Sequence, residues 1–90
     1  MQDDPQSNKS TPPARRISDL YLCGFLKARG LNFTRIEREQ YGRRVFFIFE
    51  NSPRLDELTR AFYNDDPIGA LTFKGILKNL KEIIYAESER

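Results

Sequence analysis

The feature that most constrains this chain is a run of five apolar residues, Val45–Phe49, three of which are Phe. Charged residues bound the run on both sides. A short stretch of β-branched and aromatic residues without a helical period is typical of a strand. Because side chains alternate along a strand, Phe47 and Phe49 face one way, whereas Phe46 and Ile48 face the other. Both faces of this strand must therefore be covered.

A second strand is predicted within residues 31–39, and a Gln-Tyr-Gly turn joins it to the Phe-rich strand. Three-residue hairpin loops commonly place a glycine where the chain needs a positive φ. An antiparallel hairpin with this turn brings Phe33 near Phe49 and Ile36 near Phe46. Phe33 and Ile36 differ in parity, so a regular strand would point them to opposite faces. Either a bulge realigns them, or each contributes to one of the two apolar faces of the Phe-rich strand.

Three helices are predicted around the hairpin. Ser18 is the expected N-cap of the first helix, and Gly30 is the expected left-handed residue that ends it. Gly24, in the middle of that helix, indicates a close approach to another backbone. Ser52 and Pro53 form the start of the second helix, as a cap followed by a residue that needs no N–H donor.

The third helix is expected to begin near Thr72. Its apolar residues recur at helical spacing and fall on one side of the helix. They are Phe73, Ile76, Leu77, Leu80, Ile83 and Ile84.

These elements predict one small α+β domain over residues 17–86, in the order helix, strand, strand, helix, helix. The antiparallel hairpin packs against the helices. Residues 1–16 contain three prolines and little that can be buried, which predicts a disordered tail. Residues 87–90 are expected to fray.

Little in the sequence suggests catalysis. The chain has no His, and its one cysteine, Cys23, lies among apolar residues, which predicts a buried and inert thiol. Asp65 and Asp66 lie in an Asn-Asp-Asp-Pro stretch that is ordinary turn chemistry. We therefore expect no enzymatic activity, no catalytic residues, no metal and no cofactor. A single thiol and the lack of a run of about 20 apolar residues predict a cytoplasmic protein without a membrane span.

A basic stripe is predicted on the third helix, where three lysines recur at i, i+4 and i+7 and an aromatic residue continues the line. Two arginines at the start of the Phe-rich strand extend it. The candidate phosphate or nucleic-acid contacts are Lys74, Lys78, Lys81, Tyr85, Arg43 and Arg44. Bases beside an aromatic ring can hold a nucleic-acid backbone and stack a base. The same pattern also describes a solvated helix face, and the formal charge of only +2 favours that interpretation.

A second candidate surface lies on the hairpin. If the helices cover only the side that carries Phe47 and Phe49, then Ile36, Phe46 and Ile48 remain in water on the other side. An exposed apolar sheet face can meet a second copy of itself across a twofold axis. The hairpin therefore predicts a homodimer, with a closed monomer as the alternative.

Four segments together resemble a known family: Gly30, Arg44–Glu50, Leu58–Tyr63 and Leu80–Tyr85. This is a group of small, uncharacterised bacterial and phage-associated domains of unknown function. The resemblance covers roughly residues 18–85. It implies the domain boundaries and a bacterial or phage origin, and it carries over no catalytic residues.

The leading functional prediction is a non-catalytic interaction module that self-associates or docks on a protein partner. The alternative is a nucleic-acid-binding, regulatory protein that uses the basic stripe and the hairpin arginines.

Overall fold

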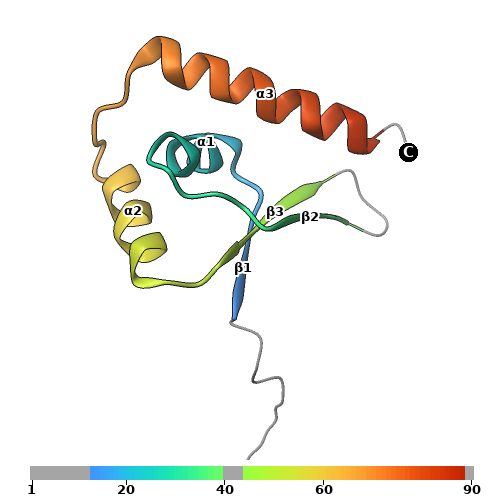
Figure 1. The fold of residues 1–90 in the computed structure, drawn as a ribbon, viewed down its shortest axis with the longest axis horizontal. Helices are drawn as coiled ribbons and strands as arrows, with labels where there is room; N and C mark the ends of the chain where they lie inside the picture. The colour runs from blue at the N-terminus through green and yellow to red at the C-terminus, as the bar shows by residue number, and fades with distance from the viewer. Residues whose placement is uncertain (1–12, 40–43, 89–90) are drawn as a thin grey trace, which may run out of the picture.

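A central antiparallel sheet and three helices make up the computed structural model, which describes residues 13–39 and 44–88 (Figure 1). In chain order the elements are β1 (Ala14–Ile17), α1 (Leu20–Ala28), β2 (Arg35–Arg38), β3 (Val45–Glu50), α2 (Pro53–Tyr63) and α3 (Ala70–Ser88). The predicted α+β class is confirmed, and the five predicted elements occur in the predicted order.

The strand β1 corrects the predicted extent of the N-terminal tail. Ala14–Ile17 pairs antiparallel with β3, so the sheet has the order β1-β3-β2, and the prediction of disorder up to residue 16 is wrong for Ala14 to Arg16. Two arginines between Ala14 and Ile17 give no strand signal, and β1 forms because β3 offers it a free edge. Residues 1–12 lie outside the described part of the chain. At the other end α3 continues to Ser88, so residues 87 and 88 are helical.

The register of β2 against β3 differs from the predicted register by one residue. Ile36 lies opposite Phe47, and Glu37 lies opposite Phe46. A shift of one residue moves every side chain of a strand to the other face. Ile36 therefore packs against the core, where one apolar side chain in a four-residue strand gains most from burial. The turn at residues 40–43 lies outside the described residues.

The inner face of the sheet forms the core with the helices. Phe33 packs edge-on against Phe47, with 4.9 Å between ring centroids, and lies 6.3 Å from Phe49, so the predicted proximity of Phe33 and Phe49 is confirmed. All three helices contribute to this core, and the fully enclosed residues come from every layer. They are Ile17, Leu22, Cys23, Phe25, Leu26, Phe47, Phe49, Leu55, Leu58 and Leu80.

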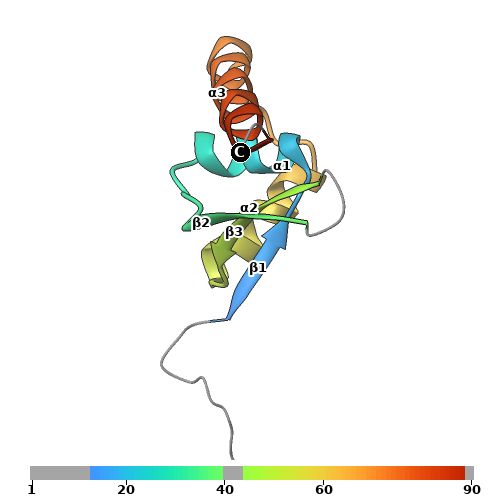
Figure 2. The same ribbon diagram turned by 90° about the vertical axis from the view of Figure 1, so that its right-hand side faces the viewer.

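The outer face of the sheet has no helix over it; Figure 2 shows α2 behind the strands and α1 and α3 above them. Ile48 is nevertheless 0% exposed, because Arg16 and Arg35 flank it on the neighbouring strands and long side-chain stems can cover apolar surface. The Arg16 guanidinium lies 4.1 Å from the centre of the Phe46 ring. Glu37 pairs with Arg16 at 3.4 Å and with Arg35 at 2.9 Å. Charged side chains therefore cover this face.

The helix ends follow the predicted chemistry with one exception. The N-cap of α1 is Asp19, not Ser18, and its carboxylate accepts hydrogen bonds from the backbone N–H groups of the first turn at 3.0 and 3.2 Å. An ionised acceptor at this end is favoured by the helix dipole. Gly30 has a φ of 90° after α1, and Ser52 caps α2 with Pro53 in its first turn, as predicted. α3 begins at Ala70, two residues before the expected start.

α1 and α3 pack closely at Gly24, but the predicted approach to another backbone is wrong, because side chains of α3 lie there. A Cβ at this position would lie 2.9 Å from Leu77 Cδ2 and 2.9 Å from Phe73 Cε1. The absence of a side chain at Gly24 therefore lets α3 lie directly on α1. The second glycine within a helix, Gly75, is different, since a Cβ there would meet nothing within 4 Å.

These two glycines give a matched pair of substitutions. We expect Gly24→Val to lower the free energy of unfolding by about 1–3 kcal/mol, because the added atoms overpack the contact between α1 and α3. We expect Gly75→Ala to raise it by about 0.5–1 kcal/mol, because alanine favours the helix and has room. Urea unfolding followed by circular dichroism measures both. A Gly24→Val variant as stable as the wild type would contradict the packing described above.

Candidate functional site

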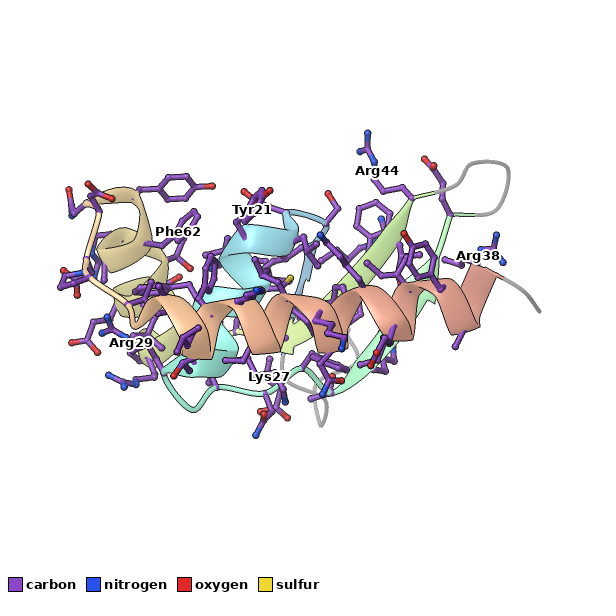
Figure 3. The ribbon with its side chains drawn as sticks, turned by 90° about the horizontal axis from the view of Figure 1, so that it is seen from above. Tyr21, Lys27, Arg29, Arg38, Arg44 and Phe62 are labelled. Atoms are coloured by element: carbon purple, nitrogen blue, oxygen red, sulfur yellow. The ribbon has the colours of Figure 1, made fainter. Side chains whose placement is uncertain are left out.

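An open groove runs along α3 and has a volume of about 820 Å³. All the described residues that line it belong to this helix. They are Ala70, Leu71, Phe73, Lys74, Gly75, Leu77, Lys78, Lys81, Glu82 and Tyr85. We call this surface the α3 groove. Figure 3 shows α3 lying lengthwise across the molecule, with α1 beneath it.

The outermost line of the α3 groove has a coiled-coil-like spacing. Leu71, Lys78 and Tyr85 are seven residues apart, and Lys74 and Lys81 fall between them. Residues at this 3.5-residue spacing form a seam that faces one way. Leu71 is 84% exposed and Tyr85 is 66% exposed. The seam therefore has large apolar or aromatic side chains at both ends and three lysines between them.

The inner wall of the α3 groove is apolar and only half-covered by the rest of the domain. Phe73 and Leu77 are half-buried where they contact Gly24. The ring centroids of Tyr21 on α1 and Phe73 are 6.3 Å apart. Of the side chains described on α3, only Leu80 is fully buried. A 19-residue helix thus contributes one enclosed side chain and leaves much apolar surface at its flank.

The lysines of the α3 groove are available to a ligand. Within residues 13–39 and 44–88, no hydrogen bond or ion pair engages Lys74, Lys78 or Lys81. The arginines around the sheet and the first two helices behave differently, because most have acidic partners. These pairs are Arg15–Asp56 at 2.6 Å, Arg16–Glu37, Arg29–Asp66 at 3.6 Å, Arg35–Glu37 and Arg54–Glu57 at 3.2 Å.

The structure brings together four of the six predicted phosphate contacts. Lys74, Lys78, Lys81 and Tyr85 line the α3 groove, as their spacing predicted. Arg44 is exposed, but it lies at the hairpin and points away from α3 (Figure 3). Arg43 and the predicted turn are outside the described residues. Arg44 therefore does not extend the basic stripe of α3 to the hairpin.

The predicted self-association patch is not formed as expected. Ile36 lies on the face of Phe47, so it does not join Phe46 and Ile48. Ile48 is fully buried and Phe46 is half-buried beneath the Arg16 guanidinium. An exposed apolar hairpin face is expected for a two-stranded sheet, whereas β1 adds a third strand and places Arg16 over Phe46. Homodimerisation itself stays a prediction.

Leu71 is the groove residue that sequence reasoning missed. It lies before the expected start of the third helix, so the predicted stripe does not include it. The signal was available, since Leu71 precedes Lys78 by seven residues and Tyr85 by fourteen. Gly75 was missed for another reason, because only the structure shows that it faces open space.

The adjacent acids Asp65 and Asp66 lie where α2 ends. Asp65 takes a φ of 64° at the end of α2, and Asp66 pairs with Arg29. Over the described parts of the chain, no three potential metal-donor side chains of His, Cys, Asp or Glu come together. The same residues include no helix with the length and apolarity to cross a bilayer.

Burial raises the pKa of the Cys23 thiol from 9.0 to about 12, and the Asp19 carboxylate adds to the rise.

The chain belongs to a family described as a domain of unknown function (DUF5659), which matches residues 15–86. The resemblance drawn from the sequence is thus confirmed at the level of a domain of unknown function, whereas a bacterial or phage origin stays a prediction. No curated protein and no solved structure matches the chain.

The Cys23 thiol should be unreactive in the folded protein. A thiol-specific reagent such as DTNB at pH 8 should label it only after urea unfolds the chain, because the thiolate is the reactive form. The raised pKa also means that the folded state holds a proton which the unfolded state loses. The free energy of unfolding should therefore fall as pH rises from about 9 to about 12. Rapid labelling without denaturant would contradict the buried position.

Substitution of Ile48 separates a closed domain from a hairpin dimer. We expect Ile48→Lys to abolish helical circular dichroism, because it places a charge at a fully buried position in a domain with only about 3–5 kcal/mol of stability. Glu50→Lys, at an exposed position on the same strand face, is the control and should remain folded. If Ile48→Lys stays helical and light scattering shows a dimer becoming a monomer, the hairpin is an oligomer interface.

Proposed function

We propose that this member of the DUF5659 family is a non-catalytic module that docks on a protein partner through the α3 groove. The observation that carries this proposal is the exposed seam of Leu71, Lys78 and Tyr85 beside a half-buried apolar wall. Contiguous apolar surface with a polar rim is characteristic of protein interaction sites. Single exposed apolar residues are common on protein surfaces and do not indicate a binding site. Leu71 and Tyr85, however, line the same groove on α3.

The composition of the α3 groove also supports a protein ligand. Aromatic and large apolar side chains act as anchors in protein interfaces, and a few polar groups set orientation and specificity. Phe73, Leu77 and Tyr85 supply the first kind of group, and the lysines supply the second. The groove is open to solvent, and its described lining residues include no cluster of acid, base and nucleophile.

Photocrosslinking from the groove tests the proposal. A benzophenone amino acid in place of Leu71, in the full-length protein in its native host cells, should give one discrete adduct with another protein. The same group in place of Tyr63, which is 68% exposed on α2, is the matched control and should give none. Lys78→Glu should weaken the adduct at position 71. An adduct of twice the chain mass, or one that nuclease removes, would overturn the proposal.

Nucleic-acid binding is the second candidate, supported by three lysines that have no acidic partner in the described part of the chain and lie beside an exposed Tyr85. Gel shifts with duplex and single-stranded DNA and RNA across a salt series test it. If phosphates are bound, affinity falls steeply with salt, and changing Lys74, Lys78 and Lys81 to Gln abolishes the shift with little effect on stability. An unchanged shift would remove α3 from any nucleic-acid site.

A further inference from the structure

We propose that the partner segment in the α3 groove is an amphipathic helix that is acidic in its middle and apolar at both ends. This inference rests on the proposed function and adds the chemistry of the partner. It follows from three features of the groove: the spacing of its seam, the order of charged and apolar residues along it, and the open glycine beside it.

The spacing of the seam fits a helix. Leu71 to Tyr85 spans about 21 Å at 1.5 Å per residue, which matches about 14 residues of a partner helix. The positions 71, 74, 78, 81 and 85 are those that face a neighbouring helix in a coiled coil. An extended peptide gains most from unpaired strand edges, and a helix surface offers it none.

The charges within the seam determine the middle of the partner. Lys74, Lys78 and Lys81 stand against one acid in the groove, Glu82, so the described lining residues carry three positive charges and one negative charge. Because these lysines have no partners among the described residues, an acidic ligand can pair with them without breaking existing ion pairs. Opposite charges across a helix pair set partner choice and orientation.

The ends of the seam and the glycine determine the rest of the pattern. Leu71 and Tyr85 are exposed and flank the lysines, so the partner needs an apolar residue opposite each. Gly75 lies on the groove and has free space where a Cβ would be. A helix glycine without a packing role in its own domain gives room for a large side chain of a partner, close to the α3 backbone.

A second copy of this chain does not fit the same groove. A twofold pair of α3 helices, whether parallel or antiparallel, would place the central lysines of one copy opposite those of the other. Like charges brought together across an interface oppose association. The structure therefore favours a different, acidic partner over self-association at α3.

Selection from a peptide library tests the inference. A displayed library of random 16-residue peptides is selected against the immobilised full chain, and binders that also bind Leu71→Glu are removed. The remaining binders should carry acidic residues in their middle and apolar residues at helical spacing towards both ends. Each should lose at least tenfold in affinity for a variant with Glu at positions 74, 78 and 81. Replacing the acids of the peptide by Lys should restore binding to that variant.

Any other result of the selection would overturn the acidic-helix inference. The alternative results also show whether the proposed docking function fails with it. Binders that depend on Leu71 but show no acidic bias keep the groove as a docking site and refute the acidic helix. A library that yields no binder dependent on Leu71 refutes the helix, while the crosslink at position 71 still decides whether a protein docks there. Single-stranded DNA that displaces the selected peptides and loses affinity on Leu71→Glu would assign the groove to nucleic acid.

Discussion

The structure depends on the burial of apolar side chains on both faces of β3. Its inner side chains, Phe47 and Phe49, enter the core, whereas Ile48 on the outer side is equally buried without a covering helix. β1 makes this arrangement possible because it serves both faces: Ile17 extends the core, and Arg16 lies over the Phe46 ring. A two-stranded hairpin could not meet this requirement without a second layer or a partner molecule.

The single-sided arrangement of the helices explains why α3 has surplus surface. α1 and α2 close much of the core over the inner sheet face, and α3 lies on top of α1 (Figures 1 and 2). Gly24 allows that contact to be close, but it fixes only one side of α3. Because α3 is packed on one side only, its other side remains exposed. That side carries Leu71, Tyr85 and three lysines.

Ion pairs divide the basic residues into two groups with different consequences. Those on the sheet and the first two helices largely join elements together, as Arg15 of β1 reaches Asp56 of α2. Exposed pairs of this kind contribute little stability individually, typically about 0–1 kcal/mol. The lysines of α3 have no such partners among the described residues, so their charge is available at the surface. A formal charge of +2 therefore understates how basic the α3 groove is.

Much of the candidate site could be predicted from the sequence, because a helix places residues on one side by spacing alone. The positions of Lys74, Lys78, Lys81 and Tyr85 followed from their numbers. The hairpin part of the site could not be predicted in the same way. Strand register is fixed by turn geometry and by what each face can bury. The predicted register differs from the observed one by one residue, so it placed Ile36 on the outer face, whereas the structure places it on the core face.

The sequence by itself determined the identity of the central strand, the three amphipathic helices and most helix ends, since these depend on residues close together in the chain. It also determined that Cys23 lies among apolar neighbours. Only the tertiary structure decided that Ala14–Ile17 is a strand, that Arg16 covers Phe46, and that Gly75 and Leu71 face open space. These features arise from contacts between distant segments, and a segment with weak local preference takes the conformation that its neighbours offer.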